Sequence, residues 1–100
     1  MENPVSFPKG GSKSRTSAQE GEGLAVAALE YLAAEPDRLS RFLGISGLGP
    51  QNLRAAAADP HFLASVLDYV IADEPLLIGL AASRDLPPQR IVAARAAMAG

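Results

Sequence analysis

A histidine, a serine and an aspartate are spaced so that they could share one face of a helix. His61, Ser65 and Asp68 stand at positions i, i+4 and i+7, and these residue types form the catalytic triad of many hydrolases. A triad also needs oxyanion donors in a pocket that excludes water, whereas these residues lie on the polar stripe of an amphipathic segment. No G-x-S-x-G turn occurs in the sequence. We therefore interpret the three residues as a solvent-exposed helix face and expect no enzymatic activity.

Residues for metal or cofactor chemistry are sparse. The chain has one histidine and no cysteine, which excludes thiolate nucleophiles, disulfides and Cys-containing zinc sites. The carboxylates show no metal-ligand spacing, and the sequence has neither a Walker-type loop nor a G-x-G-x-x-G segment after a strand. We expect no cofactor, no metal and no small-molecule substrate.

A glycine-rich turn offers a different chemistry, the binding of phosphate by backbone N–H groups. Residues 45–53 read Ile-Ser-Gly-Leu-Gly-Pro-Gln-Asn-Leu and stand between two predicted helices. This segment resembles the hairpin of helix-hairpin-helix DNA-binding proteins, in which a Gly-apolar-Gly turn leads into a helix. The resemblance implies weak, sequence-independent binding of a nucleic-acid backbone. It assigns this role to the turn, to its backbone donors and to one basic residue: Gly47, Leu48, Gly49, Gln51, Asn52 and Arg54.

An ordinary interhelical turn is the interpretation that we prefer for the same residues. Pro50 lacks an N–H group, and no lysine or arginine stands in the first turn after Gly49. Residues 80–91 similarly resemble a helix-turn-helix segment, but Asp85 stands where glycine is usual and Pro87, Pro88 and Gln89 suit base contacts poorly. The formal net charge of −2 gives no general attraction to phosphate. Nucleic-acid binding is therefore only the alternative hypothesis.

One segment is apolar on every side and points to contact with another polypeptide. Residues 76–82 read Leu-Leu-Ile-Gly-Leu-Ala-Ala, and such a helix is either central or part of an interface. Because glycine costs about 1 kcal/mol relative to alanine inside a helix, we expect a neighbouring backbone to approach Gly79 closely. The leading hypothesis is protein–protein contact or homodimerisation. Its possible interface consists of Leu76, Leu77, Ile78 and Leu80.

The elements that must position these residues are helices. Alanine and leucine dominate from Leu24 onward, and the β-branched residues are spaced too irregularly to give the alternating pattern of a strand. Prolines mark helix starts, and the pairs Glu35-Pro36, Asp59-Pro60 and Glu74-Pro75 add a carboxylate that can cap free N–H groups. Gly44 is expected to close the second helix in a left-handed conformation. The predicted helices span 23–34, 36–43, 50–58, 60–72, 75–83 and 88–98.

The fold class that follows is all-α, a compact orthogonal bundle of about five to six short helices. Residues 1–22 are rich in Pro, Gly and Ser and are expected to form a disordered tail, followed by a single helical domain at 23–99. The apolar positions at helical spacing form the expected core: Leu24, Ala25, Ala28, Leu29, Leu32, Leu39, Phe42, Leu43, Phe62, Leu63, Val66, Leu67, Tyr69, Val70, Ile91, Ala94 and Met98.

Across residues 24–98 the chain resembles a small all-helical bacterial domain family of unknown function, common in alphaproteobacteria. The resemblance is carried by residues 28–32 and 36–43, by Gly47-Leu48, by Asp59-Pro60 with residues 62–68 and by Asp73-Glu74. It implies a helical scaffold in the bacterial cytoplasm and supplies no chemistry. The absence of cysteine and of any apolar run near 20 residues agrees with a cytoplasmic location without membrane association.

Overall fold

Helices account for the regular structure throughout residues 17–98, the range that the computed structural model describes. No residue in that range forms a strand, so the predicted all-α class is confirmed. Residues 1–16, most of the expected disordered tail, lie outside the described residues. The elements are α1 (Ala18–Ala33), α2 (Pro36–Ser46), the 3-10 helix η2 (Pro50–Asn52), α3 (Leu53–Ala56), α4 (Pro60–Ile71), α5 (Glu74–Ser83) and α6 (Pro88–Ala96).

Prolines and acidic caps start the helices much as the sequence indicates. A proline occupies the first or second position of α2, α4, α5 and α6, where a missing N–H costs no helical bond. The carboxylate of Asp59 accepts the N–H of His61 at 2.9 Å. The carboxylate of Asp73 accepts the N–H of Leu76 at 3.3 Å, so the cap of α5 is Asp73 and not the predicted Glu74. Glu35 precedes α2 but makes no capping hydrogen bond.

Helix α1 begins at Ala18, so placing the end of the tail at residue 22 was wrong. The hydroxyl of Ser17 caps this helix by accepting the N–H of Glu20 at 3.1 Å. Gly21 lies where α1 meets α6, and a Cβ there would stand 2.6 Å from the carbonyl oxygen of Ala94 and 2.6 Å from Cγ of Met98. The glycine that suggests a flexible tail therefore permits a close helix contact.

The end of α2 and the segment after it also differ from the prediction. Gly44 lies within α2, and Gly47 closes the helix instead, with a φ of 77° and its N–H bonded to the carbonyl of Leu43 at 2.9 Å. The predicted helix 50–58 is divided into η2 and the four-residue helix α3. Neither of these two elements contains a buried residue, so no apolar face holds them in one longer helix.

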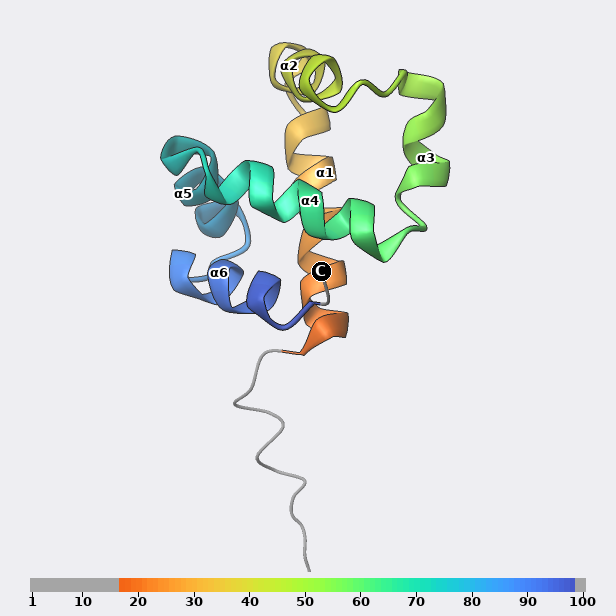
Figure 1. Ribbon diagram of the computed structural model, residues 1–100. Helices are drawn as coiled ribbons and strands as arrows, with labels where there is room; N and C mark the ends of the chain where they lie inside the picture. Colours follow the sequence, from red (N-terminus) through yellow and green to blue (C-terminus); the bar gives the residue numbers. More distant parts are fainter. Residues whose placement is uncertain (1–16, 99–100) are drawn as a thin grey trace, which may run out of the picture.

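The core lies where α4 crosses α1 (Figure 1). Helix α1 also contacts α2 and α6, and α5 packs on both α4 and α6. The ring of Phe42 meets the rings of Phe62 and Tyr69 edge to face at 6.1 and 5.1 Å and thereby joins α2 to α4. Of the predicted core residues, Leu39, Leu43, Phe62 and Tyr69 are half-buried and the others are buried.

Two ion pairs attach α6 to α1 and α4. The Nε atom of Arg90 donates to Glu20 of α1 at 2.7 Å. Arg95 forms two hydrogen bonds with the carboxylate of Asp68 on α4, at 2.7 and 3.1 Å. These bonds raise the pKa of both arginines above their ordinary value. No local sequence pattern indicates these pairs, because the partners stand 70 and 27 residues apart in the chain.

Candidate functional site

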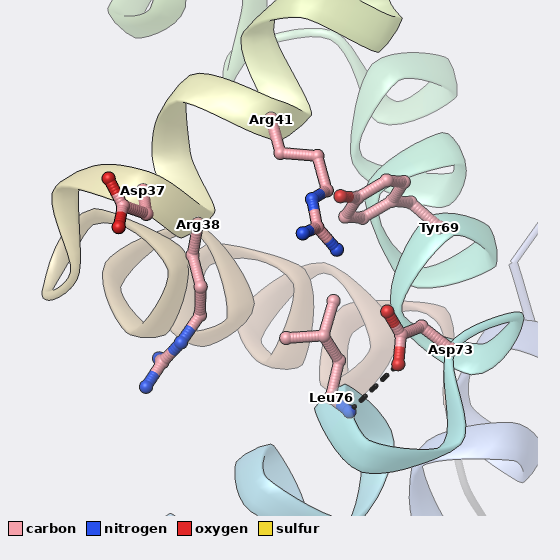
Figure 2. Close-up of a pocket in the computed structure, with 6 residues that line it drawn as sticks. All are labelled: Asp37, Arg38, Arg41, Tyr69, Asp73 and Leu76. Carbon is pink, nitrogen blue, oxygen red and sulfur yellow. Dashed lines mark hydrogen bonds between the residues drawn. The ribbon is translucent and has the colours of Figure 1, made fainter.

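A cavity of about 120 Å³ opens at the surface where α2, α4 and α5 meet (Figure 2). Its polar groups come from α2, from α4 and from the turn between α4 and α5, and its apolar wall includes a leucine of α5 and a tyrosine ring of α4. The lining residues are Asp37, Arg38, Arg41, Tyr69, Asp73 and Leu76.

The guanidinium group of Arg38 is already used for packing and points away from the cavity (Figure 2). It stands 4.2 Å from the centre of the Tyr31 ring, as in a cation–π contact. Its Nη1 atom donates to the carbonyl of Tyr31 at 3.0 Å, and its Nη2 atom lies 3.9 Å from Glu35. Arg38 therefore joins α2 to the end of α1 and is not available to a ligand.

Arg41 extends from α2 toward Tyr69, Asp73 and Leu76, into the cavity (Figure 2). Within residues 17–98 its guanidinium makes no hydrogen bond and no ion pair. The hydroxyl of Tyr69 likewise has no hydrogen-bond partner in that range, although the ring is held against Phe42. The cavity thus presents a cation and a phenolic hydroxyl whose hydrogen-bonding capacity is unused by the described residues.

Asp73 supplies the opposite charge at the other side of the cavity. Its Oδ1 atom accepts the N–H of Leu76, and its other oxygen is turned toward Arg41 (Figure 2). The two charges are not paired, because no nitrogen of Arg41 lies within 4.0 Å of the Asp73 carboxylate. The cavity can therefore hold a ligand that accepts a hydrogen bond from Arg41 and donates one to Asp73. Among its lining residues no nucleophile is placed beside a base.

The turn that resembles a helix-hairpin-helix motif uses much of its donor capacity internally. The N–H of Gly47 bonds to Leu43, that of Leu48 to the hydroxyl of Ser46 at 3.4 Å, and that of Asn52 to Gly49 at 3.0 Å. Of the assigned backbone donors, those of Gly49 and Gln51 have no hydrogen bond within the described range. Arg54 is exposed on a helix of four residues. Nucleic-acid binding by this turn stays a prediction.

The possible interface on α5 divides into an inner and an outer part. Leu80 is fully buried in the core, Leu76 and Leu77 are half-buried, and Ile78 is 51% exposed. The group that approaches Gly79 is the hydroxyl of Tyr31, which a Cβ at residue 79 would overlap. The expectation of a neighbouring backbone at that position was therefore wrong.

The triad-like residues of α4 are exposed, as predicted, and point to separate partners. Nδ1 of His61 lies 3.6 Å from Asp59, and Ser65 donates to the carbonyl of Phe62 at 2.6 Å. Asp68 is held by Arg95. Within residues 17–98 no group of three or more His, Asp or Glu side chains is placed to hold a metal ion.

Residues 80–91, which resemble a helix-turn-helix motif, contain the turn, but the second helix, α6, has no exposed basic face. Asp85 adopts a φ of 58°, the left-handed conformation for which glycine is usual. The exposed positions of α6 are Gln89, Val92, Ala93 and Ala96, and both of its arginines are ion-paired within the domain. Gln89 is therefore the one exposed side chain of α6 whose type contacts phosphates or base edges.

Sequence reasoning did not identify the cavity because its residues come from distant parts of the chain. Asp37 and Arg41 do stand at i and i+4 on one helix, which is the spacing of an ion pair, but they are not paired in the structure. That spacing is the one local signal of charged residues at this face. The positions of Tyr69 and Asp73 opposite Arg41 depend on how α4 packs on α2.

The fold and the cavity define a small helical domain with a mixed-charge surface depression and, among its described residues, no assembled catalytic group. The chain belongs to the family described as "Protein of unknown function (DUF3572)", whose model matches residues 18–100. The predicted membership in a family of unknown function is thus confirmed. Neither a curated protein nor a solved structure matches the chain. No helix within residues 17–98 is long and apolar enough to cross a membrane.

Proposed function

We propose that this domain is a non-enzymatic module that works by contact with another polypeptide, either a second copy of itself or a different protein. The observation that carries the proposal is the outer face of α5. Ile78 is half exposed there, Leu76 and Leu77 of the same helix are half-buried, and no polar side chain interrupts the helix from Pro75 to Ala82. Covering such a face removes apolar surface from water and stabilises a complex.

The other exposed large apolar residues do not form a comparable group. Val26, Ile45 and Val92 stand singly on α1, α2 and α6, and isolated residues of this kind are normal on a protein surface. The absence of cysteine and the resemblance of the sequence to bacterial domains support a place in the bacterial cytoplasm, which we propose with the function.

Sedimentation velocity over a range of concentrations tests the self-association form of the proposal. We expect the average mass to rise with concentration, and Ile78→Glu to weaken association at least about tenfold, because the new charge would be desolvated in the interface. Ile45→Glu is the matched control, since Ile45 is the more exposed isoleucine and lies on α2. Equal weakening by both variants would contradict a contact on α5.

A photo-crosslinking residue at position 78 tests contact with a different protein. The same residue at position 45 is the control, and both variants are expressed in the organism that carries the gene. We expect a discrete adduct from position 78 and none from position 45. A monomeric protein that gives no adduct at position 78 would remove the basis of the proposal.

A further inference from the structure

The cavity between α2, α4 and α5 holds opposite charges that the fold leaves unpaired. Arg38, on the same helix as Arg41, contacts both Glu35 and the Tyr31 ring. Arg41 has no such contact within residues 17–98, although Asp37 stands on its own helix and Asp73 across the cavity. The guanidinium and the inward oxygen of Asp73 are thus available to a ligand that bridges the gap.

The chemistry of the lining selects a singly charged anion that has an N–H donor beside it. Arg41 can bind a carboxylate, and the hydroxyl of Tyr69 can donate a further hydrogen bond to it. The oxygen of Asp73 accepts a hydrogen bond and repels a second negative charge. Sulfate, a dianion with no donor, therefore fits this lining poorly, and Asp73 repels the second charge of hydrogen phosphate.

The size of the cavity limits the ligand to one small residue. A volume of about 120 Å³ is somewhat less than the roughly 150 Å³ of a cavity that holds one benzene molecule. A carboxylate, the adjoining N–H and a short apolar side chain against Leu76 and the Tyr69 ring would occupy it. In a polypeptide this combination occurs at the C-terminal residue, where the carboxylate and the backbone N–H belong to the same amino acid.

We infer that this cavity binds the C-terminal residue of a polypeptide, with Arg41 and Tyr69 on the carboxylate and Asp73 on the backbone N–H. The inference deepens the proposed function and rests on it, since it names the part of a partner that the domain contacts. Leu76 of α5 lines the cavity and stands two residues before Ile78 in the same helix. A bound C-terminus would therefore place the preceding residues of the partner next to α5.

Nitrogen-15 NMR titration of the full chain with N-acetylalanine tests the inference. We expect saturable shifts of the Arg41 side-chain Nε–H and of the backbone amides of Asp73 and Leu76, with a dissociation constant in the millimolar range, on the order of that of a fragment. N-acetylalanine amide has the same N–H and side chain but no carboxylate, so it should not shift these signals. Propionate has the carboxylate but no N–H and should bind several-fold more weakly, by about three- to tenfold.

Three variants connect the shifts to the proposed contacts. Arg41→Gln should abolish detectable binding, whereas Arg54→Gln on α3 is the matched control and should leave it unchanged. Tyr69→Phe should weaken binding by about three- to tenfold, because one hydrogen bond is lost. Asp73→Asn still provides a good cap for α5, and it should reduce the preference for N-acetylalanine over propionate.

Specific results would overturn the inference. Equal binding of N-acetylalanine and its amide would show that no carboxylate is recognised, and equal shifts from inorganic phosphate would indicate a simple anion site. Tighter binding of free alanine than of N-acetylalanine would assign the cavity to free amino acids and not to polypeptides. If N-acetylalanine causes no shift, the inference fails by itself, since Ile78→Glu and crosslinking at position 78 decide the contact on α5 independently.

Discussion

Gly79 allows the side chain of Tyr31 to lie between two helices. The hydroxyl end of Tyr31 reaches the backbone of α5 at Gly79, and the guanidinium of Arg38 covers the ring from α2. One aromatic residue of α1 thereby contacts two of the three helices that border the cavity. Any side chain at position 79 would displace the ring and weaken its contact with Arg38.

Gly79→Ala should lower the free energy of unfolding by about 1 kcal/mol or more, although alanine is the better helix former. In the Tyr31→Phe background the loss should become smaller, because the hydroxyl that collides with the new methyl group is absent. Urea denaturation of the two single variants and the double variant measures this coupling. Gly44→Ala is the control, since a Cβ there meets nothing within 4 Å, and it should stabilise α2 by about 0.5–1 kcal/mol. A stabilising Gly79→Ala would contradict this account.

Single residues could be predicted only partly from the sequence. Residues 76–82 are apolar on every side, and glycine has a low helix propensity. Together these two features correctly indicated that another group approaches Gly79 closely. They did not indicate that the approaching group is Tyr31. The helix propensity of glycine shows that a side chain is absent at this position, but it does not identify the neighbouring group. The carboxylate partners of Arg90 and Arg95 depend on tertiary packing that no local pattern reveals.

At the scale of elements, α6 is held by charge as well as by its apolar face. Ile91 and Ala94 are fully buried, and the ion pairs of Arg90 and Arg95 flank them. The side chain of Arg95 is 18% exposed and donates two hydrogen bonds to one carboxylate, a geometry that fixes its orientation.

Arg95→Gln should lower the stability of the domain, and this loss should not change with pH on the basic side of neutrality. The hydrogen bond to Asp68 raises the pKa of Arg95, so its contribution is fully present below the pKa of arginine in the unfolded chain. The difference between wild type and variant should therefore be constant from about pH 7 to about pH 10. Urea denaturation across that range checks it, with Arg54→Gln as the control. A difference that falls within this range would show that another group titrates with the pair.

The starts of the helices were more predictable than their ends. Proline and the acidic caps placed the starts of α2, α4 and α6, and placed that of α5 within one residue. The start of α1 carries the Ser-x-x-Glu spacing of Ser17 and Glu20, a capping signal that the glycine-rich composition concealed. Gly44 and Gly47 are equivalent candidates for the end of α2 in sequence, and only packing decides between them.

At the scale of the whole molecule, η2 and α3 form a limb that stands away from the other helices (Figure 1). Helix α3 contacts η2, its neighbour in sequence, more than any other element. Leu53 and Ala57 pack against the core but remain half-buried. With so little apolar burial, this limb should open without unfolding of the rest of the domain.

Hydrogen exchange should show this difference between matched amides. The N–H groups of Ala57 and Ala72 each follow a helix and each donate a bond of 3.0 Å, to Leu53 and Asp68 respectively. We expect the Ala57 amide to exchange faster by about two orders of magnitude, because its bond belongs to the limb. Equal protection of the two amides would show that the limb unfolds only together with α1 and α4.

The fold class was predictable from the sequence because alanine, leucine and spaced prolines act locally. The cavity was not, because Arg41, Tyr69 and Asp73 lie on elements whose relative positions depend on Phe42 packing against α4. Of its lining residues, only Leu76 appeared among the predicted functional residues, and there as part of an interface.

The contact of Gly21 with Ala94 and Met98 packs the first helix of the described residues, α1, against the last helix, α6. Helix α6 also lies on α4 and α5, so its removal would uncover buried side chains on three helices at once. Deleting α6 from the C-terminal side should therefore unfold the whole domain and should not leave a smaller stable fragment.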